Sequence, residues 1–104
     1  MTKTEMSVLF SKHSETEQGR FENIPKKRKL SNRKDLTAFL ILDKYLTKLN
    51  HQHNNIISAT GHDEFYLDVE IEELAEIITE EDILDLVRCG IRYDRSYDCL
   101  CKFV

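Results

Sequence analysis

Charge is distributed unevenly along this chain of 104 residues, and the asymmetry limits how the chain can fold. Residues 1–34 carry nine Lys or Arg and four Glu, a net charge of +5. Residues 35–104 carry six Lys or Arg and fifteen Asp or Glu, a net charge of −9. Apolar residues are also sparse before residue 35, and a segment with little apolar surface to bury stays disordered. The sequence therefore predicts a disordered basic tail over residues 1–34 and one acidic domain over residues 35–104.

Apolar spacing in the acidic half predicts both helices and strands. Residues 35–50 have apolar side chains at three- and four-residue steps, which indicates a helix. Ile56 and Ile57 indicate a short strand, and Gly61 indicates a turn. Alternation over residues 65–71 predicts a short strand that runs into a helix beginning near Val69. The buried face of the first helix would consist of Leu36, Phe39, Leu40, Leu46 and Leu49, widened by Leu42.

The last third of the chain carries stronger local signals. Thr79 followed by Asp82 resembles a capping box, which predicts a helix start. The helix would end near Cys89, with Gly90 in the left-handed conformation that glycine adopts at low cost. Two β-prone runs, residues 91–94 and 97–104, then predict a terminal hairpin. The predicted fold class is α+β: a three-helix domain with a short strand and a C-terminal β-hairpin.

This order of elements resembles a winged-helix domain over residues 35–104. Residues 71–78 resemble its second helix, residues 79–90 its third helix and residues 91–104 its wing. The resemblance implies that the third helix reads DNA. In this chain that helix carries Glu80, Glu81, Asp82 and Asp85 beside a single Arg88, and these carboxylates would repel phosphates. The sequence therefore favours docking on protein, and an unrelated α+β fold with the same element order remains an alternative.

The sharpest motif is a run of four cations after the only proline, Lys26, Lys27, Arg28 and Lys29. The run resembles a monopartite nuclear import signal, and Arg33 and Lys34 extend the basic patch. An extended segment can place alternate cations in the acidic pockets of an import receptor. The alternatives are a solvated linker and a phosphate-binding arm.

Two further sets of residues are candidates for protein contact. The first is a predicted partner-binding surface on the second and third helices of the domain, where a dense negative charge favours a partner with a basic surface. The second is a possible docking segment in the basic tail, an isolated apolar cluster. The two sets are Glu72, Glu73, Glu76, Glu80 and Glu81 in the domain, and Val8, Leu9 and Phe10 in the tail.

Cysteine and histidine positions do not indicate a metal site or a catalytic centre. Only one residue separates Cys99 from Cys101, whereas the paired cysteines of zinc sites are usually separated by two to four residues. We interpret Cys89, Cys99 and Cys101 as free, buried thiols that face the helices. A zinc site completed by His51, His53 or His62 is the alternative. Neither a nucleophile beside a base nor a glycine-rich phosphate loop is recognisable, so we expect no enzyme, cofactor, metal or small-molecule substrate.

These observations predict a small nuclear adaptor, a protein–protein interaction subunit of a complex acting on chromatin, transcription, DNA replication or repair. The chain contains no apolar run long enough for a membrane span, so no membrane partner is expected. Contact with DNA would be indirect. Two alternatives remain: a nucleic-acid-binding protein that uses the arm over residues 26–34, and an inhibitor whose acidic surface mimics nucleic acid.

Overall fold

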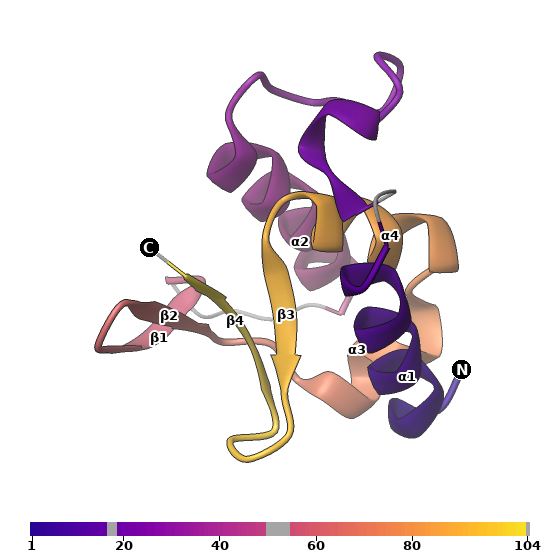
Figure 1. Ribbon diagram of the computed structural model, residues 1–104. Coiled ribbons are helices and arrows are strands. Elements are labelled where there is room, and N and C mark those ends of the chain that lie inside the picture. The colour runs from indigo at the N-terminus through magenta and orange to yellow at the C-terminus, as the bar shows by residue number, and fades with distance from the viewer. Residues whose placement is uncertain (17–18, 50–54, 104) are drawn as a thin grey trace.

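The computed structural model describes residues 1–16, 19–49 and 55–103 (Figure 1). Within these ranges the chain forms α-helices, one 3₁₀ helix and a four-stranded antiparallel sheet, so the predicted α+β class is confirmed. The elements are α1 (Lys3–Ser14), the 3₁₀ helix η2 (Phe21–Asn23), α2 (Lys34–Lys48), β1 (Ile57–Gly61), β2 (Glu64–Leu67), α3 (Ile71–Ile77), α4 (Glu80–Arg88), β3 (Ile91–Asp94) and β4 (Cys99–Phe103).

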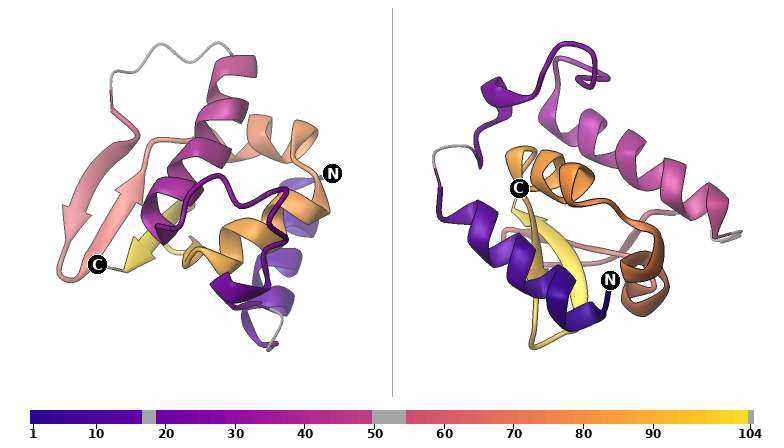
Figure 2. Two further views of the ribbon diagram at one scale, coloured as in Figure 1. Left: turned by 90° about the horizontal axis from the view of Figure 1, so that it is seen from above. Right: turned by 90° about the vertical axis from the view of Figure 1, so that its right-hand side faces the viewer.

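The strands follow the order β1-β2-β4-β3, so that β4 lies inside the sheet between β2 and β3. The predicted terminal hairpin is confirmed by the antiparallel pairing of β3 with β4. Where one short strand is predicted before the second helix of the domain, the structure has the β1–β2 hairpin, which turns at His62 and Asp63. This hairpin extends away from the helices (Figures 1 and 2).

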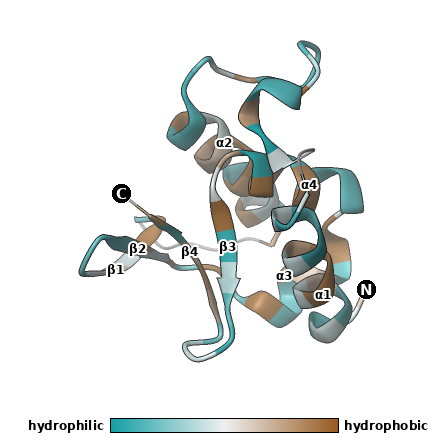
Figure 3. Ribbon diagram, viewed as in Figure 1, coloured by the Kyte–Doolittle hydropathy of each residue, from teal (hydrophilic) through white to brown (hydrophobic). Residues whose placement is uncertain are grey.

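The core lies between one face of the sheet and the helices. The register pairs Tyr93 with Leu100, and these two residues share this face with Ile91 and Leu67. Hydropathy colouring shows apolar residues on the inward sides of the helices (Figure 3). Alternate residues of each strand point to the opposite face. That outer face lies away from the helices, which gather on the core side of the sheet (Figure 2).

At the N-terminus the structure does not confirm a disordered tail. Residues Lys3–Ser14 form α1, and a capping box between Thr2 and Glu5 begins this helix. Met6 and Phe10, one turn apart, are buried in the core together with Phe21 of η2. Full burial of a large apolar side chain stabilises a fold by about 1.5–3 kcal/mol. A few well-placed side chains therefore hold this region on the domain despite its low apolar content.

Helix α2 matches the predicted helix closely in extent, but its predicted buried face is only partly correct. Leu42 and Leu46 are buried, whereas Leu36 and Leu40 are 44% and 40% exposed. The buried stripe instead runs through Tyr45, along with Thr37, Ala38 and Ile41. The phenolic oxygen of Tyr45 bonds to Asp82, so the ring can enter the core with its polar end satisfied. Leu49 is partly buried, and Asn50 lies outside the described residues.

Helix α4 is the central helix of the fold, and its predicted boundaries are confirmed. The Thr79 hydroxyl accepts a hydrogen bond from the backbone of Asp82 at 3.1 Å, which caps the helix. Gly90 follows the helix with φ of +91°, the left-handed conformation predicted for it. Within residues 83–89, Ile83, Leu86 and four further residues are buried, and only Leu84 is partly exposed. None of the described helices has both the length and the apolar character needed to cross a bilayer.

Candidate protein-interaction site

The basic segment, residues 25–34, links η2 to α2 and begins with a compact turn. The backbone N–H groups of Arg28 and Lys29 both donate to the Pro25 carbonyl, at 2.9 and 3.0 Å. Just before the turn, Phe21 and Ile24 are buried in the core and fix where the turn begins. The cation run therefore lies in a folded turn, whereas the sequence predicts an extended segment.

Arg28 forms a two-point ion pair with Asp85 of α4. Its Nε donates to Asp85 Oδ2 at 2.9 Å, and its Nη2 donates to Oδ1 at 3.3 Å. The Asp85 side chain is 1% exposed and also accepts a hydrogen bond from Arg88 Nη1 at 2.9 Å. The hydrogen bond to Asp85 is the main reason that the pKa of Arg28 is raised. A buried carboxylate is costly unless it is paired, so Arg28 has a structural role here.

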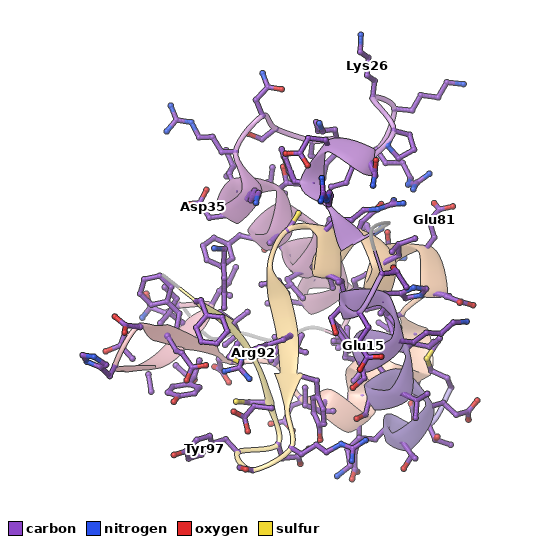
Figure 4. The ribbon with its side chains drawn as sticks, viewed as in Figure 1. Glu15, Lys26, Asp35, Glu81, Arg92 and Tyr97 are labelled. Carbon is purple, nitrogen blue, oxygen red and sulfur yellow. The ribbon has the colours of Figure 1, made fainter. Side chains whose placement is uncertain are left out.

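The other cations of the basic segment are differently placed. Lys26 and Lys27 are exposed, and Lys26 points away from the molecule (Figure 4). Lys29 is partly buried, and its ammonium lies 4.5 Å from the centroid of the Phe21 ring. Arg33 and Lys34 are exposed at the start of α2. Four of the six predicted import residues are therefore exposed, while Arg28 and Lys29 lie against the protein.

The acidic face consists of the predicted partner-binding residues, and the structure brings them onto two consecutive helices. Glu72, Glu73 and Glu76 lie on α3, and Glu80 and Glu81 lie in the first turn of α4. All five are exposed. Carboxylates at a helix start are favoured by the helix dipole, which accounts for part of this clustering.

Three residues of the acidic face contact basic groups from the first 34 residues. The contacts are Lys3 Nζ to Glu72 Oε1 at 3.9 Å, His13 Nε2 to Glu80 Oε1 at 3.5 Å and Arg28 Nε to Glu81 Oε1 at 3.3 Å. The His13 contact is an ion pair only when the imidazole is protonated. The sequence predicts that the basic and acidic parts of the chain bind different partners. In the structure, basic residues of the first part instead contact acidic residues of the second part.

Asp82 connects the start of α4 to α2. Its Oδ2 accepts hydrogen bonds from Lys44 Nζ at 2.9 Å and from the Tyr45 hydroxyl. Burial alone would raise the pKa of Asp82, but the hydrogen bonds from Tyr45 and Lys44 outweigh burial and lower it. Asp82 is therefore a structural carboxylate that holds two helices together. No simple sequence pattern predicts it, because the partners lie 37 and 38 residues away.

A groove of about 400 Å³ lies between the basic segment, α2 and the start of α4. Leu30 and Leu40, both exposed, contribute to its apolar wall. The sequence predicts that Leu40 belongs to the buried face of its helix, whereas in the structure Leu40 is exposed at this groove. The remaining lining residues are Lys27, Arg28, Ile41, Lys44, Thr79, Glu81, Asp82 and Asp85.

The predicted docking segment in the tail is not a separate unit in the structure. Phe10 is buried in the core, Leu9 is partly buried and Val8 is 52% exposed, all on α1. Only Val8 and part of Leu9 are accessible. They line an open depression of about 480 Å³ together with Met1, Thr4, Glu5 and Glu80.

The three cysteines are free thiols, but they do not all face the helices as predicted. Leu100 takes the core-facing position in β4, so Cys99 and Cys101 point to the outer face of the sheet. Burial raises the pKa of Cys89 to about 12 and that of Cys101 to about 11. Among the described residues no group of three or more His, Cys, Asp or Glu could hold a metal ion. His51 and His53 lie outside the described residues.

The outer face of the sheet carries aromatic side chains that the sequence analysis does not single out. Tyr66 and Tyr97 have ring centroids 5.3 Å apart, and the Arg92 guanidinium lies 4.4 Å from the Phe103 ring centroid. Arg92 also contacts Glu64. Arg92 and Tyr97 are seen on this side of the molecule in Figure 4. The alternation of β4 could have predicted the position of Phe103, but the ring pair depends on the turn between β3 and β4.

These features describe a small α+β domain with charged and apolar contact surfaces. Comparison with protein-family models, with curated proteins and with solved structures finds no match to this chain.

Proposed function

We propose that this protein is a nuclear adaptor, a non-enzymatic subunit that uses its acidic face to bind a partner with a basic surface. The observation that carries the proposal is the exposure of all five acidic-face residues, which are concentrated on α3 and the first turn of α4. Basic groups of the chain itself contact Glu72, Glu80 and Glu81 of this face, yet the five carboxylates stay exposed. A dense set of like charges repels itself, and a cationic partner relieves that repulsion.

The arrangement of elements supports a winged-helix-like architecture within the proposal. After α2 come the β1–β2 hairpin, two consecutive helices and a terminal hairpin. Strand β2 pairs with β4, so that the hairpin is attached to the preceding strand. In this interpretation α3 and α4 are the second and third helices of the domain, and β3 and β4 form the wing.

The surroundings of α4 favour protein contact over DNA contact. A helix that reads DNA must present one side chain face to a groove. Most of α4 is buried, and the exposed residues at its start are Glu80 and Glu81. These carboxylates would face phosphates in a DNA complex, which is electrostatically unfavourable.

Nuclear import through the cation run completes the proposal. Lys26 and Lys27 are exposed, and Arg33 and Lys34 extend the exposed positive charge along the chain. Delivery to the nucleus is consistent with a subunit of a complex acting on chromatin, transcription, replication or repair. A nucleic-acid-binding arm is the second candidate function, because the same exposed cations could contact phosphates.

The test begins with affinity purification of the whole chain from nuclear extract and identification of the co-purifying chains. Association with the purified partner is then measured for the variant Glu73→Lys/Glu76→Lys. A matched control, Glu22→Lys/Asp43→Lys, changes the net charge equally at exposed acids outside the acidic face. We expect the first variant to associate more slowly and the control to associate like the wild type.

Equal association rates for the two variants would contradict the acidic face as the partner site. Salt-sensitive binding of the wild type to DNA, lost in Lys26→Ala/Lys27→Ala, would favour the nucleic-acid-binding arm instead. If the acidic face binds a nucleic-acid-binding protein and competes there with nucleic acid, the inhibitor that mimics nucleic acid would be favoured.

A further inference from the structure

We propose that the fold masks its own import signal: the cation run binds an import receptor only after residues 21–30 leave the surface of α4. This inference rests on the proposed import function of the cation run, and it adds a regulation of that site. The observations that carry it are the turn at Pro25, the ion pair between Arg28 and Asp85 and the buried side chains of Phe21 and Ile24.

The backbone of the cation run has the wrong shape for receptor binding in this conformation. A peptide recognised in extended form presents successive side chains to opposite sides, so that alternate cations reach separate pockets. Here the backbones of Arg28 and Lys29 are bonded to the Pro25 carbonyl. Residues 25–29 must therefore unfold from this turn before they can extend along a receptor groove.

Two of the four cations are also occupied. Both hydrogen bonds from the Arg28 guanidinium go to the buried carboxylate of Asp85, and Glu81 Oε1 lies 3.3 Å from the same Nε. Lys29 lies over the Phe21 ring. A receptor must compete with these intramolecular partners for Arg28 and Lys29, whereas Lys26 and Lys27 are accessible at once.

Apolar anchors hold the segment closed. Phe21 and Ile24 are 9% and 3% exposed and belong to the core cluster. Because they lie directly before the cation run, their release would free the turn and let Arg28 leave Asp85. Asp85 would keep Arg88 as a partner after this release. The closed and open states thus differ by one short segment, and the rest of the core can persist.

The experiment uses a purified import receptor that recognises lysine-rich signals. Its affinity is measured for each of three samples. These are a peptide covering residues 20–34, the whole chain, and the whole-chain variant Phe21→Ser/Ile24→Ser. Apparent affinity falls in proportion to the fraction of molecules in the competent state. We expect the peptide and the released variant to bind at least about tenfold more tightly than the wild-type chain.

The matched control is Val8→Ser/Ile77→Ser, which makes the same kind of change at exposed apolar residues. It should bind like the wild type. The peptide comparison needs no variant, so it remains decisive if the released variant does not fold. If the folded wild-type chain binds as tightly as the peptide, masking is refuted while the import function stands. If the peptide with its cations intact does not bind, the import function itself is refuted, and the masking inference with it.

Discussion

Phe10→Ala tests whether the N-terminal region belongs to the folded domain. Phe10 is 2% exposed and lies in the core cluster together with Met6. Truncating a buried phenylalanine to alanine costs about 3–5 kcal/mol, because apolar contacts are lost and a cavity remains. A domain of this size has a total stability of about 5–15 kcal/mol. The substitution should therefore remove a large share of the free energy of unfolding.

Thermal unfolding followed by circular dichroism gives a clear readout. A loss of 1 kcal/mol lowers the Tm of a small domain by about 4–8 °C, so we expect a decrease of more than about 12 °C. Val8→Ala is the matched control, because Val8 is on the same helix and 52% exposed. It should change stability by less than about 0.5 kcal/mol. If Phe10→Ala and Val8→Ala unfold at the same temperature as the wild type, α1 is not part of the cooperative core.

Three further predictions concern individual groups. The pKa of Asp82 is lowered in the folded state, so ionised Asp82 stabilises the fold above the pKa of the unfolded carboxyl. The free energy of unfolding should therefore fall as the pH drops below about 4. Asp82→Asn should weaken this acid dependence, which urea unfolding at several pH values measures. Cys89 and Cys101 should resist a thiol reagent at neutral pH in the native protein, with Cys99 reacting first and all three reacting in denaturant. Gly90→Ala should cost about 1 kcal/mol or more in chemical unfolding, because φ is +91° there.

Sequence reasoning succeeds where the signal is local. Helix α4 begins after Thr79, whose hydroxyl accepts a hydrogen bond from the Asp82 backbone, and it ends before Gly90. Both signals lie within a few residues of the helix ends. The terminal hairpin has alternating β-prone residues on both sides of a polar turn. Such features depend little on distant parts of the chain, so their positions can be predicted without knowledge of the tertiary contacts.

Sequence reasoning fails where distant contacts decide the outcome. Helix α1 has few apolar residues, and what orders it is the docking of Met6 and Phe10 onto the rest of the core. The capping box at Thr2 and Glu5 is the signal that could have indicated its start. In α2, the leucines are compatible with two different buried faces. The face that is buried contains Tyr45, whose hydroxyl bonds to the distant Asp82. The Arg28 contact spans 57 residues and has no local signal.

The contacts between the two charged halves differ in strength, and this difference has a consequence for salt dependence. Surface ion pairs such as Lys3 with Glu72 contribute about 0–1 kcal/mol and are screened by salt. The buried pair of Arg28 with Asp85 and the apolar contacts of α1 are screened much less. Raising the ionic strength should therefore leave the N-terminal region on the domain while it weakens any partner held by the exposed acidic face. A partner that dissociates in salt without loss of the native fold would be bound by charge at the acidic face. A partner retained at high salt would be bound mainly by apolar surface, for which the groove at Leu30 and Leu40 is the candidate.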